Sequence, residues 1–306
     1  MKVKFFFLAA ASVMMTACSS DEQTTDETTL RLTTKNIVAD TRSAVQDLQL
    51  TQFANGQSVG IFLVENVSGT PTRTGENVTS YAQPLSYSAD GSGNLTNVQY
   101  WPSDGNGLFI YGIYPANAAS AYDATGVTFS VQANQSTDAN YMASDLMTGA
   151  PTSNPVVRTG STVPLTFTHL LTKVNINLTA GSGFTANDLT TATVSILGLK
   201  PTTTFSVQST TVTAASGDAT DIIAGTGATT SAIIVPAQSV AANTNFIKVT
   251  CAGGDYFYKM GTATTFDASS VYTYNLTVNK TGLTLSTASI TAWTSIGAVD
   301  GTAVLQ

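Results

Sequence analysis

Short apolar segments separated by turn-forming residues recur along most of this chain. Residues 59–64 (VGIFLV) are continuously apolar, which is typical of a short strand buried on both faces. From residue 163 onward apolar and polar residues alternate, as in residues 173–178, so one face of each strand packs on a core and the other meets water. Only residues 185–192 hint at a short helix. The pattern predicts an all-β protein built from antiparallel sandwiches.

Further strands are expected wherever apolar and aromatic residues cluster between turn residues. One turn, Asp90-Gly91-Ser92-Gly93-Asn94, has the composition of a hairpin connection. The other expected strands are residues 30–38, 99–101, 108–114, 127–131, 163–167, 194–199, 205–207, 233–235, 247–251, 256–260, 272–278, 283–285, 290–293 and 303–305.

The chain is long enough for two domains. A Pro- and Gly-rich bridge at residues 154–162 places their boundary near residue 160. We therefore expect an N-terminal sandwich domain over residues 43–160 and a C-terminal one over residues 161–306.

The first residues have the layout of a secretion signal. Two lysines precede an apolar run at residues 5–17, which is shorter than the about 20 residues that a membrane-spanning helix needs. Met15-Thr16-Ala17-Cys18 resembles a lipobox, so residues 1–17 are predicted to be removed and Cys18 to be lipidated. The alternative is an ordinary signal peptide that is cut near Ala17, with Cys18 incidental. Residues 19–29 are polar and acidic, as in a flexible tether.

Charge and cysteine content limit the possible partners and the possible disulfides of the chain. Only 10% of residues are charged and the net charge is −7, which argues against nucleic acid as a partner. Cys18 and Cys251 are the two cysteines, so acylation of Cys18 leaves no disulfide. Cys251 alternates with Val249 and Ile247, as a small buried hydrophobe would.

Catalytic signals are weak, and we predict that the protein is not an enzyme. Gly56-Gln57-Ser58-Val59-Gly60 matches the G-x-S-x-G nucleophile elbow, and His169 follows in the order of an α/β-hydrolase. That motif requires a strand before it and a helix after it. Here a polar loop precedes it and an apolar strand follows, so the segment is interpreted as a turn that enters a strand.

Metal sites and cofactors are not expected. His169 is the one histidine, so a histidine-based metal cluster cannot form. The turn at residues 90–94 resembles the start of a calcium loop, but Leu95 and Trp101 stand where such a loop needs glycine and an acid. A plain hairpin is the preferred interpretation.

Several segments in order resemble the fimbrillin family, the pilin subunits and relatives of Bacteroidales type V pili. The segments span nearly the whole chain after the signal, and each alone is weak. They are DTRSA (40–44), FANGQSVGIF (53–62), WP (101–102), YGIYP (111–115), LTFTHLLTKV (165–174), IVPAQ (234–238), YTYNL (272–276) and ITAW (290–293).

The resemblance implies two transthyretin-like antiparallel β-sandwich domains in tandem and an outer-membrane lipoprotein precursor. In that family an Arg-specific protease removes the first strand, and a strand from a neighbouring subunit fills the groove. The implied partners are that protease, the outer membrane through the lipid of the precursor, and further subunits in a homopolymeric fimbrium. No cofactor is implied.

The predicted cleavage site is Arg42, followed by the small residue Ser43. Arg42 lies in a polar break after the expected first strand, so residues 18–42 would form a removable pro-segment. Arg31 is the second candidate, but it lies inside that strand.

The predicted donor strand is the C-terminal segment at residues 283–306. Its apolar residues available to enter a groove are Ile290, Trp293, Ala303, Val304 and Leu305. The alternative is that they form an ordinary last hairpin of the second domain.

Two other functions stay open. Within the same family the chain could be an accessory tip or anchor subunit. From another class it could be a surface glycan-binding lipoprotein that never polymerises, since exposed aromatic rings stack on sugars. Trp101 and Trp293 both lie in strand-like segments, which favours a place in the core over a sugar platform.

Overall fold

The computed structural model describes residues 28–34, 53–72, 84–122 and 124–293. Nearly all of its regular structure is β, which confirms the predicted fold class. The strands are β1 (Thr29–Thr33), β2 (Ser58–Val67), β3 (Thr70–Thr72), β4 (Leu85–Ala89), β5 (Asn94–Tyr100), β6 (Gly107–Tyr114), β7 (Val127–Ser130), β8 (Met147–Ala150), β9 (Val163–Pro164), β10 (Thr166–His169), β11 (Thr172–Ala180), β12 (Thr193–Leu199), β13 (Thr202–Phe205), β14 (Thr220–Thr226), β15 (Thr229–Ile234), β16 (Ser239–Val240), β17 (Asn245–Cys251), β18 (Gly254–Lys259), β19 (Thr264–Thr265), β20 (Ser270–Asn279) and β21 (Gly282–Ala292).

Helices are short within the described part of the chain. The 3-10 helix η1 (Ala186–Leu189) lies where residues 185–192 hinted at one. The helix α1 (Asp138–Ala143) has no counterpart among the expected elements. The Thr137 side chain caps α1 by accepting a hydrogen bond from the Asn140 amide at 3.4 Å. A helix of fewer than two turns is too short to produce a clear 3.6-residue hydrophobic period.

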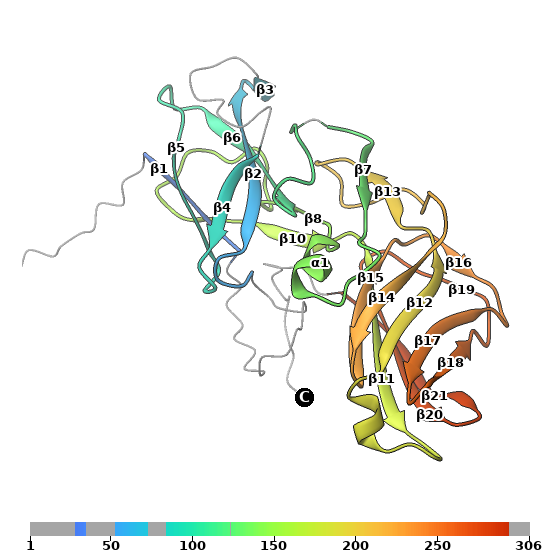
Figure 1. Cartoon of the computed structure of the whole chain (residues 1–306). Coiled ribbons are helices and arrows are strands. Elements are labelled where there is room, and N and C mark those ends of the chain that lie inside the picture. The colour runs from blue at the N-terminus through green and yellow to red at the C-terminus, as the bar shows by residue number, and fades with distance from the viewer. Residues whose placement is uncertain (1–27, 35–52, 73–83, 123, 294–306) are drawn as a thin grey trace, which may run out of the picture.

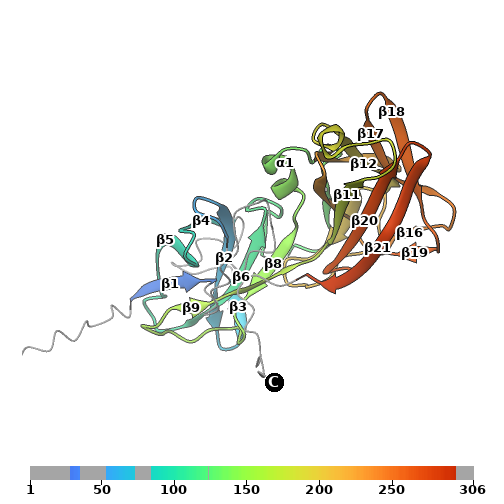
Figure 2. The ribbon, with the colours of Figure 1, turned by 90° about the horizontal axis from the view of Figure 1, so that it is seen from below.

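Among the described residues, nine strands form a sheet in the order β10-β8-β6-β2-β4-β5-β1-β9, with β3 paired to β2. The two ends of this order, β9 and β10, are separated in the chain by Leu165 alone. The sheet therefore curls until its ends meet in one continuous segment. We call residues 163–169 the closing strand. Figures 1 and 2 show this sheet at one end of the molecule.

Strand β2 is buried on both faces, as its continuous apolar sequence predicts. Val59, Ile61 and Leu63 belong to the core inside the nine-stranded sheet. Phe62 and Val64 point the other way and belong to a second, larger core. Because strand side chains alternate between faces, one strand contributes to both cores.

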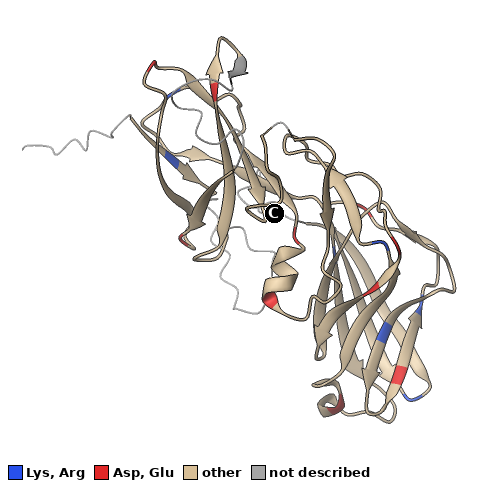
Figure 3. Ribbon diagram, turned by 45° about the horizontal axis from the view of Figure 1, so that its top comes forward, with Lys and Arg blue, Asp and Glu red and all other residues tan. Residues whose placement is uncertain are grey.

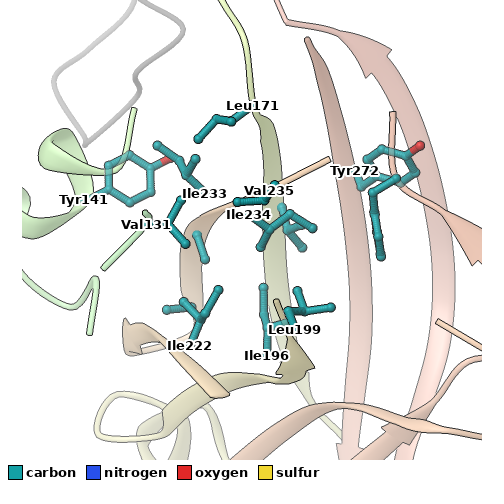
Figure 4. Close-up of a cluster of buried hydrophobic side chains, with 14 of the residues drawn as sticks. Val131, Tyr141, Leu171, Ile196, Leu199, Ile222, Ile233, Ile234, Val235 and Tyr272 are labelled. Carbon is teal, nitrogen blue, oxygen red and sulfur yellow. The ribbon is translucent and has the colours of Figure 1, made fainter. Parts of the chain in front are cut away.

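The second core lies between two four-stranded sheets, ordered β15-β11-β20-β21 and β14-β12-β17-β18 in the described region. Their inward side chains alternate with polar ones, and β11 pairs in parallel with β20. Figure 4 shows part of this core, where Ile196, Ile222 and Ile234 come together from three strands. The strands expected at 283–285 and 290–293 merge into the single strand β21.

Sheet membership crosses residue 160 in both directions. The closing strand follows that residue yet pairs with β1 and β8 of the nine-stranded sheet. Strand β7 precedes it yet pairs with β13. The buried side chain of Gln135 also binds Ile233 of β15 through two hydrogen bonds of 2.8 Å. The division into domains at 43–160 and 161–306 stays a prediction.

Candidate functional site: strand β1 and its slot

Strand β1 occupies an interior position in the nine-stranded sheet. It pairs antiparallel with β5, where Leu32 faces Leu95, and parallel with β9, where Leu32 faces Val163. We call the position between β5 and β9 the β1 slot. A strand with a neighbour on each side leaves no backbone edge of its own exposed, and it covers one edge of each neighbour.

Two side chains hold β1 in the core. Leu30 and Leu32 are each 2% exposed and belong to the cluster inside the sheet, whereas Arg31 between them faces the solvent. Burying a leucine stabilises a protein by about 1.5–3 kcal/mol. Together the two leucines attach a five-residue strand firmly, yet they are few enough for another strand to replace.

Backbone contacts secure both ends of β1. At its start the Trp101 amide donates to the Thr28 carbonyl at 2.9 Å. At its end the Gly93 carbonyl accepts from the Thr34 amide at 2.6 Å and from the Thr33 hydroxyl at 2.7 Å. The strand thus ends against the turn that joins β4 to β5.

That turn is the predicted hairpin connection at residues 90–94, and it is confirmed. The Asp90 amide donates to the Asn94 carbonyl at 3.1 Å, and the Asp90 carboxylate accepts from the amides of Ser92 and Asn94. The Asn94 side-chain amide also donates to Asp90 at 2.6 Å. These hydrogen bonds, that of the Asn94 side chain first, lower the pKa of Asp90 below its ordinary value. The turn that carries Gly93 is therefore held by hydrogen bonds of its own, which do not involve β1.

The other wall of the β1 slot is the closing strand. Its Leu165 amide donates to the Thr33 carbonyl at 2.7 Å. From there the closing strand leaves β1 and continues as β10 along β8, where Phe167 faces Gly149. One segment of seven residues thus borders the slot and closes the sheet.

Of the predicted site residues, two lie in the described part of the chain. Ile290 is on β21, at the outer position of its sheet, and is 60% exposed. Trp293 directly follows β21 and is 3% exposed. Cys18, Arg42, Ser43, Ala303, Val304 and Leu305 lie outside the described residues.

Trp293 meets residues that sequence reasoning did not connect. Its ring stacks on the ring of His169, with centroids 3.9 Å apart and planes 6° from parallel. His169 is completely buried at the end of β10, and its Nδ1 lies 2.8 Å from Oδ1 of the buried Asp145. The only sequence signal was the presence of His169 and Trp293 in two of the family-like segments.

The fold does not bring together the residues of the weak hydrolase-like motif. Ser58 begins β2 and is exposed, whereas His169 is buried against Asp145 and Trp293, so the structure does not bring the two together. Both tryptophans are buried, as predicted. Cys251 is 4% exposed, which confirms its place in the core, and burial raises the pKa of its thiol.

The described residues contain neither a metal-binding cluster nor a helix that could span a membrane. No group of three or more His, Cys, Asp or Glu side chains there is placed to hold a metal ion. No helix in that part is long and apolar enough to cross a membrane.

Comparison with known proteins identifies a family and solved structures with a similar fold. A family model described as fimbrillin-like matches residues 41–293. A Bacteroides uniformis structure described as a cell adhesion protein is 23% identical, covers 87% of this chain and 98% of its own, and has a TM-score of 0.64. A similarly described structure from Bacteroides ovatus is 18% identical over 87% and 98% of the two chains, with a TM-score of 0.61. These likenesses show a shared fold. No curated relative is similar enough to match.

Proposed function

This chain belongs to the fimbrillin-like family, and from that premise we propose that it is a structural pilus subunit without catalytic activity. It is exported as a lipoprotein precursor, activated when an Arg-specific protease removes β1, and polymerised when a strand of another subunit enters the β1 slot. The observation that carries the proposal is the interior position of β1 between β5 and β9.

Removal of β1 would change the sheet in a specific way. The facing edges of β5 and β9 would lose their backbone partners, and the sites of Leu30 and Leu32 would open to water. An open edge next to apolar pockets binds an extended strand, with backbone hydrogen bonds giving affinity and alternate side chains giving specificity. The uncut precursor has neither feature at this place, so it stays unassembled.

Cleavage at Arg42 fits this scheme better than cleavage at Arg31. Arg42 lies in the connection between β1 and β2, so a cut there separates all of β1 from the body. Of the two buried leucines of β1, a cut after Arg31 would release only Leu30, because Leu32 would stay covalently attached to the body of the subunit. Only the first cut empties the slot.

The proposed donor is residues 303–305. Ala303 and Leu305 are two positions apart, as Leu30 and Leu32 are, so they would point to the same face of an entering strand. Val304 would take the place of Arg31. In this chain Trp293 is packed against His169, so we assign it to the body of the subunit rather than to the part that enters the slot.

The lipid has a temporary role in this proposal. Cys18 holds the precursor at the outer membrane, and a cut at Arg42 releases Cys18 together with β1. The working subunit then resides in the fimbrium, and contacts with other subunits take over from the acyl chains.

A direct test is to treat the purified precursor with an Arg-specific protease and to sequence the new N-terminus. The expected result is a start at Ser43 and a ladder of oligomers that resists mild denaturation. Arg42→Ala should block both, whereas Arg31→Ala should block neither. Deletion of residues 302–306 should leave a subunit that is cut but does not polymerise. A cut at Arg42 that yields a lasting monomer would refute the proposal.

A further inference from the structure

Three distant segments meet at the junction of the two cores. His169 ends the closing strand, Asp145 lies between α1 and β8, and Trp293 follows the last described strand. The stacked rings of His169 and Trp293 are both buried, and the Asp145 carboxylate holds the imidazole by its Nδ1. A carboxylate on one ring nitrogen fixes the orientation of an imidazole, so the ring presents a fixed surface to the indole.

Backbone contacts secure the same place. The Trp293 amide donates to the Ser269 carbonyl at 2.8 Å, and the Ser269 hydroxyl donates to the His169 carbonyl at 2.5 Å. Ser269 is also bound to Leu171 through its amide, at 2.9 Å. The residue after β21 is therefore fixed by both its side chain and its backbone.

Strand β21 is held mainly by its pairing with β20. Among the described strands it pairs only with β20, and most of its side chains are exposed on both faces. It carries no charged residue. Figure 3 shows that charged residues are sparse over the rest of the described ribbon as well. A strand with a single neighbour opens from its ends inward, one pair at a time, so the contact at its end controls how easily it opens.

We infer that Trp293 is a positioning residue that locks the C-terminal end of β21 to the closing strand, so that the chain beyond Trp293 begins at a fixed point. The role as the origin of a donor rests on the proposed function, whereas the lock itself does not. The closing strand borders the β1 slot at Val163 and holds Trp293 at His169. The slot that a donor strand would enter and the point where this subunit's own C-terminal segment begins thus both border the seven-residue closing strand.

Hydrogen exchange of the uncut precursor tests the lock. Trp293→Leu keeps an apolar side chain but removes the stack, and Trp293→Phe keeps an aromatic ring on His169. Trp293→Leu should speed exchange about tenfold for the amides of Thr291 and Ser289, which lie opposite Val271 and Thr273 of β20 in the hydrogen-bonded pairs next to Trp293, given the usual energy of an aromatic pair. The Thr284 amide, opposite Thr277 at the far end of the strand, should change little. Trp293→Phe should keep most of the protection.

A matched control separates a lock from general destabilisation. Ile247→Val removes one methyl group from the core of the opposite sheet, at a cost similar to that of an aromatic pair. It should not speed exchange selectively at the Trp293 end of β21. Uniform acceleration along β21 in Trp293→Leu, or none, would overturn the inference.

Fluorescence tests whether the lock persists in the polymer. The difference between the wild-type and Trp293→Phe spectra isolates the emission of Trp293. In the precursor it should be blue-shifted and quenched by the imidazole, and it should brighten in His169→Phe. Emission of a water-exposed indole there would contradict the buried stack.

After protease treatment the emission of Trp293 should stay as it is while oligomers form. A red shift upon assembly would show that Trp293 leaves with the donor and would overturn its role as the fixed origin. If no oligomers form, the proposed function fails, but exchange and fluorescence of the precursor still decide whether the lock exists.

Discussion

Phe167 of β10 packs directly on Gly112 of β6. A methyl group built on Gly112 would lie 2.2 Å from Cζ of Phe167, and one built on the paired Gly149 would lie 2.8 Å from the same ring. Two glycines thus give the ring its space inside the nine-stranded sheet. The glycine in the segment YGIYP is required by a ring that lies 55 residues later in the chain at Phe167, and not by a turn.

Gly112→Ala should therefore destabilise the protein by about 1–3 kcal/mol, the usual cost of overpacking a core. Chemical denaturation measures this change. Gly261→Ala is the control, because a methyl group there meets nothing within 4 Å, and it should stay within about 0.5 kcal/mol of wild type. Phe167→Leu should cost less in the Gly112→Ala background than alone, and strict additivity would contradict the close contact.

Leu32→Ala should weaken the attachment of β1. Leu32 is 2% exposed, and truncating a buried leucine costs about 2–5 kcal/mol. The amides of β1 should then exchange faster in the uncut precursor, and β1 should dissociate faster once it is cut. Arg31→Ala, on the exposed face of the same strand, serves as the control and should change neither. Equal effects of the two substitutions would show that the leucine does not hold β1.

The turn that receives β1 should depend on pH through Asp90. Its hydrogen bonds with Asn94 and Ser92 lower the pKa of the folded carboxyl, so the unfolded chain binds a proton first as the pH falls. The stabilisation is complete above the ordinary value of 3.8 and is lost as the pH falls through the lowered pKa. NMR spectra of the Ser92 and Asn94 amides across this range should report the loss. Asp90→Asn should abolish the pH dependence, and an unchanged titration of these amides in that variant would assign it to another group.

Local patterns predicted the parts of this fold that depend on neighbouring residues. The continuous apolar run in β2 predicted burial on both faces, and the turn at 90–94 predicted the β4–β5 hairpin. Helix α1 was not predicted because a helix of fewer than two turns shows almost no hydrophobic period. The candidate site was predicted only in outline. Leu30 and Leu32 were recognised as part of a first strand, but the partners of that strand were not.

The sequence by itself determined the all-β class, the alternation of core and surface positions, and the buried character of Cys251 and both tryptophans. These follow from side-chain period and turn chemistry, which act over a few residues. Only the tertiary structure decided that β1 lies between β5 and β9, that the closing strand changes its pairing partner from β1 to β8 at Leu165, and that Trp293 rests on His169. Each joins segments far apart in the chain, and the pairing of distant strands depends on how whole sheets pack, which no local pattern specifies.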